Sequence, residues 1–307
     1  MPDKEYLNYL TNEIVTLKKE RNAVILAHFY QRPEVQEVAD FVGDSLGLSR
    51  QASRTNAEAI IFCGVHFMAE SASILSPDKI VVLPDEHAGC PMADMVDAVQ
   101  LRRKKSEIPD AIVVCYVNTS AEVKADSDIA CTSANAVEVV ASLPKDKPIL
   151  FIPDKNLGNY ISLKTGREMI MWDGYCSTHD KLTPQEVLKA RAEHPEALVL
   201  VHPECRPEVV ALADSVSSTS GIIRFARESG ADEFIIGTEA GILHQLHKQC
   251  PDKKFYMASN KLVCPNMKKT TLDKVRSALM NLEPRVTVTD EIRTRAIHCL
   301  ERMLEVT

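Results

Sequence analysis

The apolar positions of this chain form three similar series of buried strands and amphipathic helices. Each series opens with a run of mostly β-branched residues, which is typical of a parallel strand buried on both faces. The three copies start at Ala23 (AVILAHFYQRPEVQEVADFVGDSLG), Ala111 (AIVVCYVNTSAEVKADSDIACTSAN) and Ala197 (ALVLVHPECRPEVVALADSVSSTSG). This self-similarity predicts an internal repeat, each copy of which begins with such a strand.

Polar residues recur at fixed positions within the three copies. The first strand of each copy ends in a histidine or tyrosine: His28, Tyr116 and His202. Twelve residues later comes an aspartate: Asp40, Asp128 and Asp214. Five residues after that comes a hydroxyl side chain: Ser45, Ser133 and Thr219. Chance rarely produces the same spacing three times, so these positions support the repeat.

Two further strands are expected in each copy. They lie at 60–64 and 80–83, at 149–153 and 168–171, and at 234–237 and 254–257. Alternating strand and helix patterns predict an α/β fold with parallel sheets covered by helices. Units of about 85 residues bury little core alone, so we expect three pseudo-threefold-related αβα (Rossmann-like) units around a central site. The expected division is 1–106 with an N-terminal helix, 107–194, and 195–307 with C-terminal helices.

Composition and charge narrow the class of protein. Of 307 residues, 45% are hydrophobic and 26% charged, which is typical of a globular chain. The net charge of −7 and the lack of a basic block argue against nucleic acid and anionic membranes as partners. Apolar runs reach only about five residues, too few to span a bilayer. The N-terminus is charged and helix-periodic rather than a secretion signal, so we expect a cytoplasmic protein.

Three of the nine cysteines occupy equivalent places in the repeat. Cys90 lies 45 residues after Ser45, Cys176 lies 43 after Ser133, and Cys264 lies 45 after Thr219. The other six have no counterparts in this register, and we expect them to be buried packing residues. An odd number of widely spaced cysteines without an export signal also argues against a disulfide framework.

Equivalent loops of threefold-related units should meet near their axis, so the three thiolates could share a metal. Iron–sulfur clusters take cysteine thiolates, and three ligands would leave one iron open to act as a Lewis acid. A zinc site is the competing interpretation, with His87 or His179 as a fourth ligand, although no C-x-x-C pair is present. Three unrelated buried cysteines are the other alternative.

The strand ends predict a ligand pocket. In open α/β sheets, ligands bind beyond the carboxyl ends of the strands. Pairs of residues spaced i, i+2 stand there, on one side of each strand: His28 and Tyr30, Tyr116 and Asn118, and His202 and Glu204. Ser45, Ser133 and Thr219 precede helical patterns and are expected to be N-caps, which would bring three helix N-termini to bind an anionic ligand. Lys268 and Lys269 are expected at a solvated helix start.

Specific motifs then identify a family. The stretches ILAHFYQRPEVQEVADFVGDS, HFMAES, CPMAD, YVNTSAEVKADSDIACTSANAVEVV, PDKNLGNY, VHPEC, GTEAG and CPNMKKTTL resemble the quinolinate synthase family over about residues 23–275. The resemblance implies three αβα domains around a [4Fe–4S] cluster held by Cys90, Cys176 and Cys264. It also implies an enzyme of NAD biosynthesis that condenses iminoaspartate (iminosuccinate) with dihydroxyacetone phosphate to give quinolinate, phosphate and water. An L-aspartate oxidase or dehydrogenase would supply the iminoaspartate.

The same resemblance implies residue roles. The substrate-binding residues would be His28, Ser45, Tyr116, Asn118, Ser133, His202, Glu204 and Thr219. Tyr30 and Glu204 are the candidate catalytic residues, because dehydration and imine tautomerisation require proton transfer near neutral pH. Two other classes stay open: a reductive dehydroxylase of isoprenoid synthesis, whose motifs do not match, and a non-catalytic cluster protein, which would normally ligate all four irons.

Overall fold

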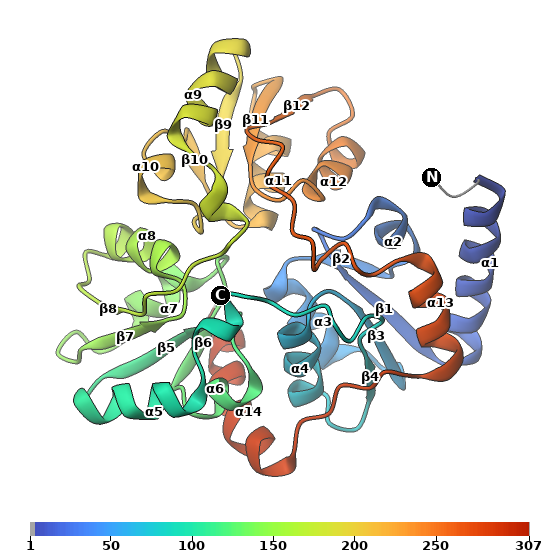
Figure 1. The fold of residues 1–307 in the computed structure, drawn as a ribbon, viewed down its shortest axis with the longest axis horizontal. Coiled ribbons are helices and arrows are strands. Elements are labelled where there is room, and N and C mark those ends of the chain that lie inside the picture. Colours follow the sequence, from blue (N-terminus) through green and yellow to red (C-terminus); the bar gives the residue numbers. More distant parts are fainter. Residues whose placement is uncertain (1–3, 307) are drawn as a thin grey trace.

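A computed structural model describes residues 4–306 and contains three four-stranded parallel sheets around a common centre (Figure 1). Their strand orders are β2-β1-β3-β4, β6-β5-β7-β8 and β10-β9-β11-β12, so the three sheets share one topology. The predicted class, three pseudo-repeated αβα units, is confirmed. The expected divisions at 106/107 and 194/195 stay a proposal; they lie at the ends of α5 and α9, ahead of the next central strand.

The first unit follows the long N-terminal helix α1 (Lys4–Glu20). Its strands are β1 (Ala23–His28), β2 (Phe41–Gly43), β3 (Ala59–Cys63) and β4 (Ile80–Val82). Its helices are α2 (Pro33–Val38), α3 (Ser45–Arg54) and α4 (His66–Leu75). A 3₁₀ turn at Ala93–Met95 follows the loop that carries Cys90.

The second unit begins after α5 (Ala98–Glu107). Its strands are β5 (Ile112–Tyr116), β6 (Ile129–Cys131), β7 (Ile149–Ile152) and β8 (Ile170–Met171). Its helices are α6 (Ala121–Ala125), α7 (Ala136–Ser142) and α8 (Lys155–Thr165). The strand expected at 168–171 is therefore shorter than predicted. A 3₁₀ turn at His179–Lys181 follows the loop with Cys176.

The third unit begins after α9 (Pro184–Glu193). Its strands are β9 (Leu198–Val201), β10 (Ser215–Val216), β11 (Glu233–Gly237) and β12 (Lys254–Met257). Its helices are α10 (Pro207–Val210), α11 (Thr219–Glu228) and α12 (Ile242–Gln249), and the chain ends in α13 (Leu272–Asn281) and α14 (Asp290–Glu305).

The pairing register is the same in the three sheets. In each, the residue two positions before the strand-end histidine or tyrosine pairs with the residue directly after the repeated aspartate. The pairs are Leu26 with Phe41, Val114 with Ile129, and Leu200 with Ser215. The repeat in the sequence is thus a repeat of hydrogen-bonded structure.

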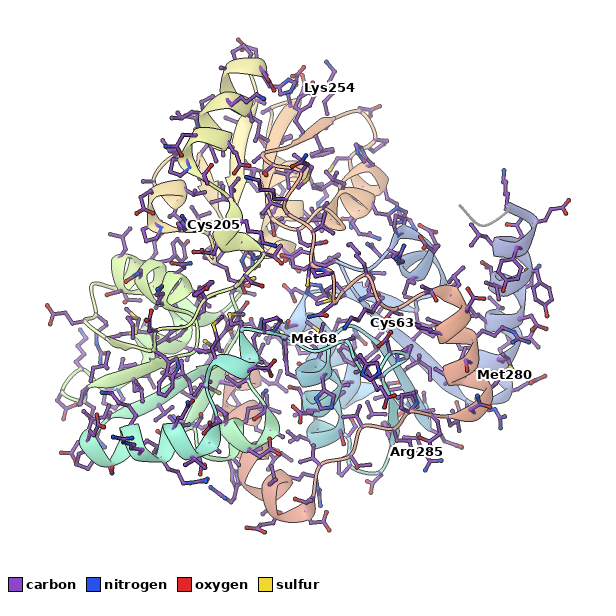
Figure 2. The ribbon with its side chains drawn as sticks, viewed as in Figure 1. Cys63, Met68, Cys205, Lys254, Met280 and Arg285 are labelled. Carbon is purple, nitrogen blue, oxygen red and sulfur yellow. The ribbon has the colours of Figure 1, made fainter. Side chains whose placement is uncertain are left out.

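The two C-terminal helices pack away from the third unit, which precedes them in the sequence. Leu272 and Val275 of α13 join the apolar cluster formed by α1 and the outer face of the first sheet. Leu300 and Met303 of α14 join the largest cluster, which includes the second unit. Figure 2 shows Met68 of α4 near the centre, where the units meet, and Lys254 at the periphery. The C-terminal segment therefore packs on the first unit through α13 and on the second unit through α14.

Candidate active site and metal centre

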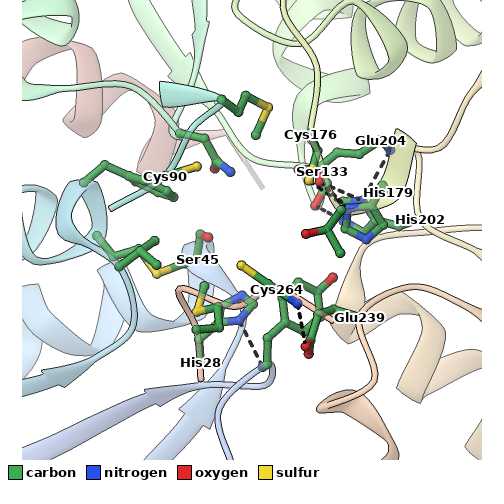
Figure 3. A pocket seen from close by; sticks show the side chains of 18 of the residues that line it. His28, Ser45, Cys90, Ser133, Cys176, His179, His202, Glu204, Glu239 and Cys264 are labelled. Atoms are coloured by element: carbon green, nitrogen blue, oxygen red, sulfur yellow. Dashed lines mark hydrogen bonds and ion pairs between the residues drawn. The ribbon is translucent and has the colours of Figure 1, made fainter. Parts of the chain in front are cut away.

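The strand-end residues of all three units line one central cavity. They are His28 and Tyr30, Tyr116 and Asn118, and His202 and Glu204. The cavity encloses about 750 Å³ between atoms, including its opening to solvent. Each strand ends at the same edge of its sheet, and the three edges face one another (Figure 3). The structure thus brings together side chains that are up to 176 positions apart in the sequence.

Three hydroxyl residues also line the cavity, but the prediction that they are helix N-caps is wrong. Ser45 and Thr219 are the first residues of α3 and α11. The N-caps are Asp44 and Ser218, one position earlier, whose side chains accept hydrogen bonds from backbone N–H groups in the first turn. Ser133 lies three residues before α7 begins. A neighbouring side chain therefore takes the capping role at α3 and α11, whereas the N-cap of α7, Asn135, makes no side-chain capping hydrogen bond.

Because they do not cap, two of these hydroxyls make contacts between units. Thr219 Oγ1 lies 2.9 Å from the Tyr30 hydroxyl. Ser133 Oγ lies 3.1 Å from His202 Nε2. The start of α3, at Ser45, and the start of α11 lie at the cavity wall, where helix N-termini favour anions.

The three register-matched cysteines line the same cavity, one from each unit (Figure 3). Cys90, Cys176 and Cys264 are partly exposed to the cavity, whereas the other six cysteines are buried. All nine are free thiols. The repeat spacing therefore separates the cavity cysteines from the packing cysteines correctly.

The surroundings of these sulfur atoms fit metal-bound thiolates. Burial raises the pKa of Cys90 to about 12 and also raises the pKa values of Cys176 and Cys264. Backbone N–H groups oppose this shift at each sulfur, including those of Ala93, His179 and Met267. Buried thiols stay protonated without a cation, and N–H groups directed at sulfur are a feature of iron–sulfur sites. The three residues therefore fit a shared metal centre.

A chain of hydrogen bonds joins Tyr30 to Glu204. The Thr238 hydroxyl lies 2.7 Å from the Tyr30 hydroxyl and 2.8 Å from His179 Nε2. His179 Nδ1 lies 2.7 Å from Glu204 Oε2. Tyr116 donates a 2.5 Å hydrogen bond to Glu204 Oε1. Both candidate acid–base residues are thus ends of one buried polar network.

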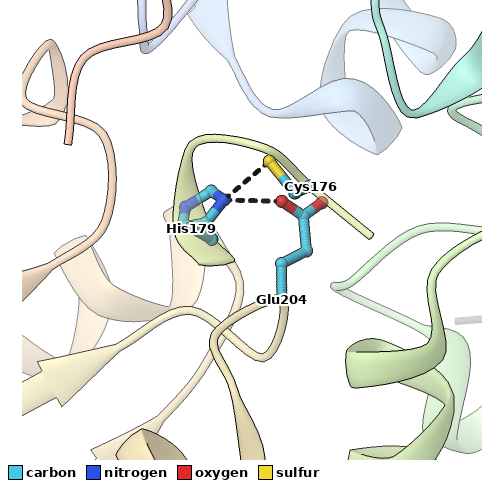
Figure 4. Close-up of side chains that lie close together, drawn as sticks. All are labelled: Cys176, His179 and Glu204. Carbon is cyan, nitrogen blue, oxygen red and sulfur yellow. Dashed lines mark hydrogen bonds and ion pairs between the residues drawn. The ribbon is translucent and has the colours of Figure 1, made fainter. Parts of the chain in front are cut away.

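His179 also lies beside a cavity cysteine. Its Nδ1 is 3.2 Å from Cys176 Sγ, so the same ring nitrogen contacts both that sulfur and the Glu204 carboxylate (Figure 4). Ligand atoms of these three residues lie within 4.8 Å of one another, close enough to hold a single metal ion. A mononuclear site of this kind is the structural form of the zinc alternative. His87, the other candidate ligand, does not line the central cavity.

The buried surroundings shift the pKa values of the ionisable groups in the cavity. It lowers the pKa of His28 and of His202 to about 3, so both imidazoles are neutral near pH 7. Burial opposes ionisation of Glu204, but His202, His179 and the Tyr116 hydrogen bond outweigh it and lower the pKa of this carboxyl. Burial also raises the pKa of Tyr30 well above 10. The cavity thus holds a charged carboxylate and a neutral phenol.

The cavity offers polar groups to a ligand without cationic side chains. Among the described residues that line it, none is Lys or Arg. The side-chain oxygen of Asn118 is buried and has no hydrogen-bond partner among the described residues. An anionic ligand would therefore meet hydroxyls, helix starts, neutral imidazoles and the three cysteine side chains.

Sequence reasoning missed three polar residues of this site. Thr238 and Glu239 directly follow β11. Glu239 lines the cavity, and Thr238 belongs to the hydrogen-bond chain between Tyr30 and Glu204. Asp44 caps α3 and lines the cavity. A systematic comparison of the residues after β3, β7 and β11, the third strand of each unit, would have directed attention to the first two.

The described residues contain no helix that is both long and apolar enough to cross a membrane.

Comparisons with known proteins give a consistent result. Residues 12–305 match the family model of the quinolinate synthetase A protein. The chain is 61% identical to quinolinate synthase of Desulforudis audaxviator over 295 residues, which cover 96% of this chain and 97% of that protein. It is 57% identical to quinolinate synthase of Methanosarcina barkeri, with 97% of each chain covered. It is 55% identical to quinolinate synthase of Geotalea uraniireducens, with 98% and 99% covered.

Proposed function

This chain belongs to the quinolinate synthetase A protein family, and from that premise we propose that it condenses iminoaspartate with dihydroxyacetone phosphate to form quinolinate. Phosphate and two waters would leave. The protein is an enzyme, and its family implies a place in NAD biosynthesis. The convergence of three equivalent cysteines on one polar cavity carries the proposal.

The cavity suits these two substrates. Iminoaspartate carries two carboxylates and dihydroxyacetone phosphate a phosphate, so the combined ligand has several anionic groups. The starts of α3 and α11 and the hydroxyls of Ser45, Ser133 and Thr219 would bind them. His28, His202, Tyr116 and Asn118 would supply the remaining hydrogen bonds. Such a site positions both substrates without arginine side chains.

Cys90, Cys176 and Cys264 would hold a [4Fe–4S] cluster. When bound, a cluster with one open iron supplies a Lewis acid to a substrate oxygen. The three thiols reach one cavity from three units, and each would lose its proton on binding the cluster. The single-ion site at Cys176, His179 and Glu204 is the competing arrangement.

Tyr30 and Glu204 would perform the proton transfers. Glu204 is ionised and accepts a proton from the substrate, whereas the Tyr30 phenol is neutral and donates one to a leaving hydroxyl. The hydrogen-bonded chain through His179 and Thr238 allows a proton to pass between them. Dehydration at one end and deprotonation at the other would then need no bulk water.

The supply of iminoaspartate and the location of the enzyme follow from the same chemistry. Iminoaspartate is unstable, so an L-aspartate oxidase or dehydrogenase would act immediately upstream. We propose a cytoplasmic enzyme, since an open iron and nine free thiols suit a reducing compartment.

The test is anaerobic turnover of the purified protein with both substrates, together with iron and sulfide analysis. We expect quinolinate and four irons per chain. The Tyr30→Phe variant should keep the cluster but lose roughly 100-fold or more in kcat, the usual contribution of a general acid. Colourless protein with one tightly bound zinc would contradict the cluster. A brown protein that forms no quinolinate would contradict the reaction and favour a non-catalytic cluster protein.

A further inference from the structure

A buried carboxylate stands behind one of the cavity cysteines. Glu239 lies two residues beyond β11 and is 0% exposed. Its Oε1 accepts a hydrogen bond from the backbone N–H of Cys264, at 3.1 Å. Its Oε2 accepts one from the backbone N–H of Gly241, at 2.7 Å. We propose that Glu239, paired with Lys268, is a positioning residue that fixes the Cys264 loop and sets the charge around the proposed metal centre.

Lys268 is the partner that neutralises this carboxylate. Its Nζ lies 2.9 Å from Glu239 Oε1 and 3.0 Å from Oε2. The same Nζ donates to the backbone carbonyl of Tyr30 in the first unit. The expected solvated helix start is therefore wrong: α13 begins only at Leu272, and the Lys268 side chain is 21% exposed. A buried carboxylate attracts the ammonium group because it needs a paired charge.

The backbone of the third unit crosses close to Tyr30 at this point. A Cβ atom at Gly241 would lie 2.7 Å from Tyr30 Cα and 2.8 Å from Glu239 Oε2. Arg32 adds a hydrogen bond from Nε to the carbonyl of Lys268, at 2.8 Å. Glu239 thus orients the Cys264 loop and, through Lys268, fixes that loop relative to the candidate acid Tyr30.

The repeat provides an independent comparison. The position two residues beyond the third strand of a unit, β11 in the third unit, is Asp154 after β7 in the second unit and Val65 after β3 in the first. The Asp154 carboxyl is buried, and the backbone of Asp154 forms a bridge with Gly174 of the Cys176 loop. Its Oδ1 accepts a hydrogen bond from the Leu157 N–H, and its Oδ2 has no hydrogen-bond partner among the described residues. Two of the three units therefore place a fully buried carboxyl group at this repeat position, but only Glu239 is hydrogen-bonded to the backbone of a cysteine loop.

Glutamine cannot replace Glu239 at this site. Three donors converge on the two carboxylate oxygens: the N–H groups of Cys264 and Gly241, and the Lys268 ammonium. An amide presents one oxygen and one NH₂ group, so at least one of these donors would face another donor. Lys268 would also lose its counter-charge. The Cys264 loop should then open more often.

The first test is backbone hydrogen exchange in the cluster-free protein. We expect the Cys264 and Gly241 amides of Glu239→Gln to exchange at least about tenfold faster than in the unchanged protein. The matched control is Glu37→Gln, which removes an exposed carboxylate that pairs with His244 and Lys248 across the same boundary between units. Equal exchange of the Cys264 amide in Glu239→Gln and in the unchanged protein would overturn the proposal.

The second test is the reduction potential of the reconstituted cluster, and it rests on the proposed metal centre. Glu239→Gln removes a negative charge and should raise the potential, whereas Lys268→Met removes a positive charge and should lower it. Lys268→Arg keeps the positive charge, so its cluster should have the reduction potential of the unchanged protein. A merely structural role would not shift the potential in opposite directions, so shifts of one sign in both variants would overturn the electrostatic part.

The two tests separate the proposals. If the unchanged protein takes up no cluster, the proposed metal centre fails, while hydrogen exchange of the cluster-free protein still decides the role of Glu239. If the cluster forms and turnover occurs, but the Cys264 amide exchanges equally in Glu239→Gln, only the inference about Glu239 fails.

Discussion

At the scale of single residues, the cavity keeps two imidazoles neutral beside a charged carboxylate. Burial lowers the pKa of His28 and of His202 to about 3, from an ordinary value of 6.5. Neutral imidazoles can both donate and accept hydrogen bonds, so they suit recognition of a polar substrate. They add no positive charge that would strengthen the electrostatic hold on an anionic product.

The two histidines predict how stability depends on pH. Between pH 6.5 and 3 the unfolded chain binds protons that folded His28 and His202 exclude, so stability is fully present above pH 6.5 and declines as pH falls toward 3. We expect the melting temperature of the cluster-free protein to drop steadily from pH 7 to pH 5. Differential scanning fluorimetry across this range measures it.

The matching variants are His28→Gln and His298→Gln. His28→Gln removes one buried imidazole and should flatten the decline between pH 7 and pH 5. His298 has a side chain that is 77% exposed, so its replacement should leave the decline unchanged. A decline that is equally steep in all three proteins would show that other groups cause it.

At the scale of elements, the repeated aspartate has a structural role in each sheet. The carboxylates of Asp40, Asp128 and Asp214 accept hydrogen bonds from backbone N–H groups of β1, β5 and β9, at 2.8, 2.7 and 2.8 Å; the donors are Ile25, Val113 and Val199. The backbone N–H of each aspartate donates to the carbonyl of the same residue. The paired edge strands β2, β6 and β10 contain only two or three residues. The aspartate therefore extends a short strand pairing.

Removing this side chain should weaken one sheet without altering the cavity. We expect Asp128→Ala to cost about 1 kcal/mol, the usual net value of such a hydrogen bond. Asp128→Asn should cost less, because its amide oxygen can still accept. The midpoint of urea unfolding measures both changes, and Asp146→Ala, in an exposed loop, is the control. An unchanged midpoint in Asp128→Ala would contradict this role.

At the scale of the whole molecule, one cavity depends on all three units. Each contributes one cysteine, and helices distant in sequence tie the units together. Arg295 of α14 pairs with Asp126 of the second unit. Asn135 donates to the carbonyl of Met303, at 3.0 Å. On the first unit, Tyr6 of α1 donates to Asp273 of α13, at 2.5 Å. A metal held by all three units would therefore stabilise the assembly as well as the site.

Loading the proposed metal centre should raise the melting temperature. A group that binds the folded state tightly stabilises it by mass action, by about 4 kcal/mol at 1,000 times its dissociation constant. Anaerobic reconstitution with iron and sulfide, followed by calorimetry, measures this gain. Cys264→Ser should gain little, whereas Cys250→Ser, at a buried cysteine outside the cavity, should gain as much as the unchanged protein. An equal gain in both variants would exclude Cys264 as a ligand.

The sequence by itself determined the three repeated units, the spacing of their polar positions, and the three cysteines that share the cavity. These features depend on local periodicity and on spacing within one copy, which an α/β repeat carries along the chain. The strand-end residues from His28 to Glu204 could be selected for the same reason.

Only the tertiary structure decided how residues of different units meet. The N-caps of α3 and α11 are Asp44 and Ser218, one position before the predicted residues, because their side chains reach the free N–H groups of the first turn. The chain from Tyr30 through Thr238 and His179 to Glu204 crosses all three units. Such contacts join atoms that no spacing rule relates, because they depend on how three separately formed sheets pack against one another.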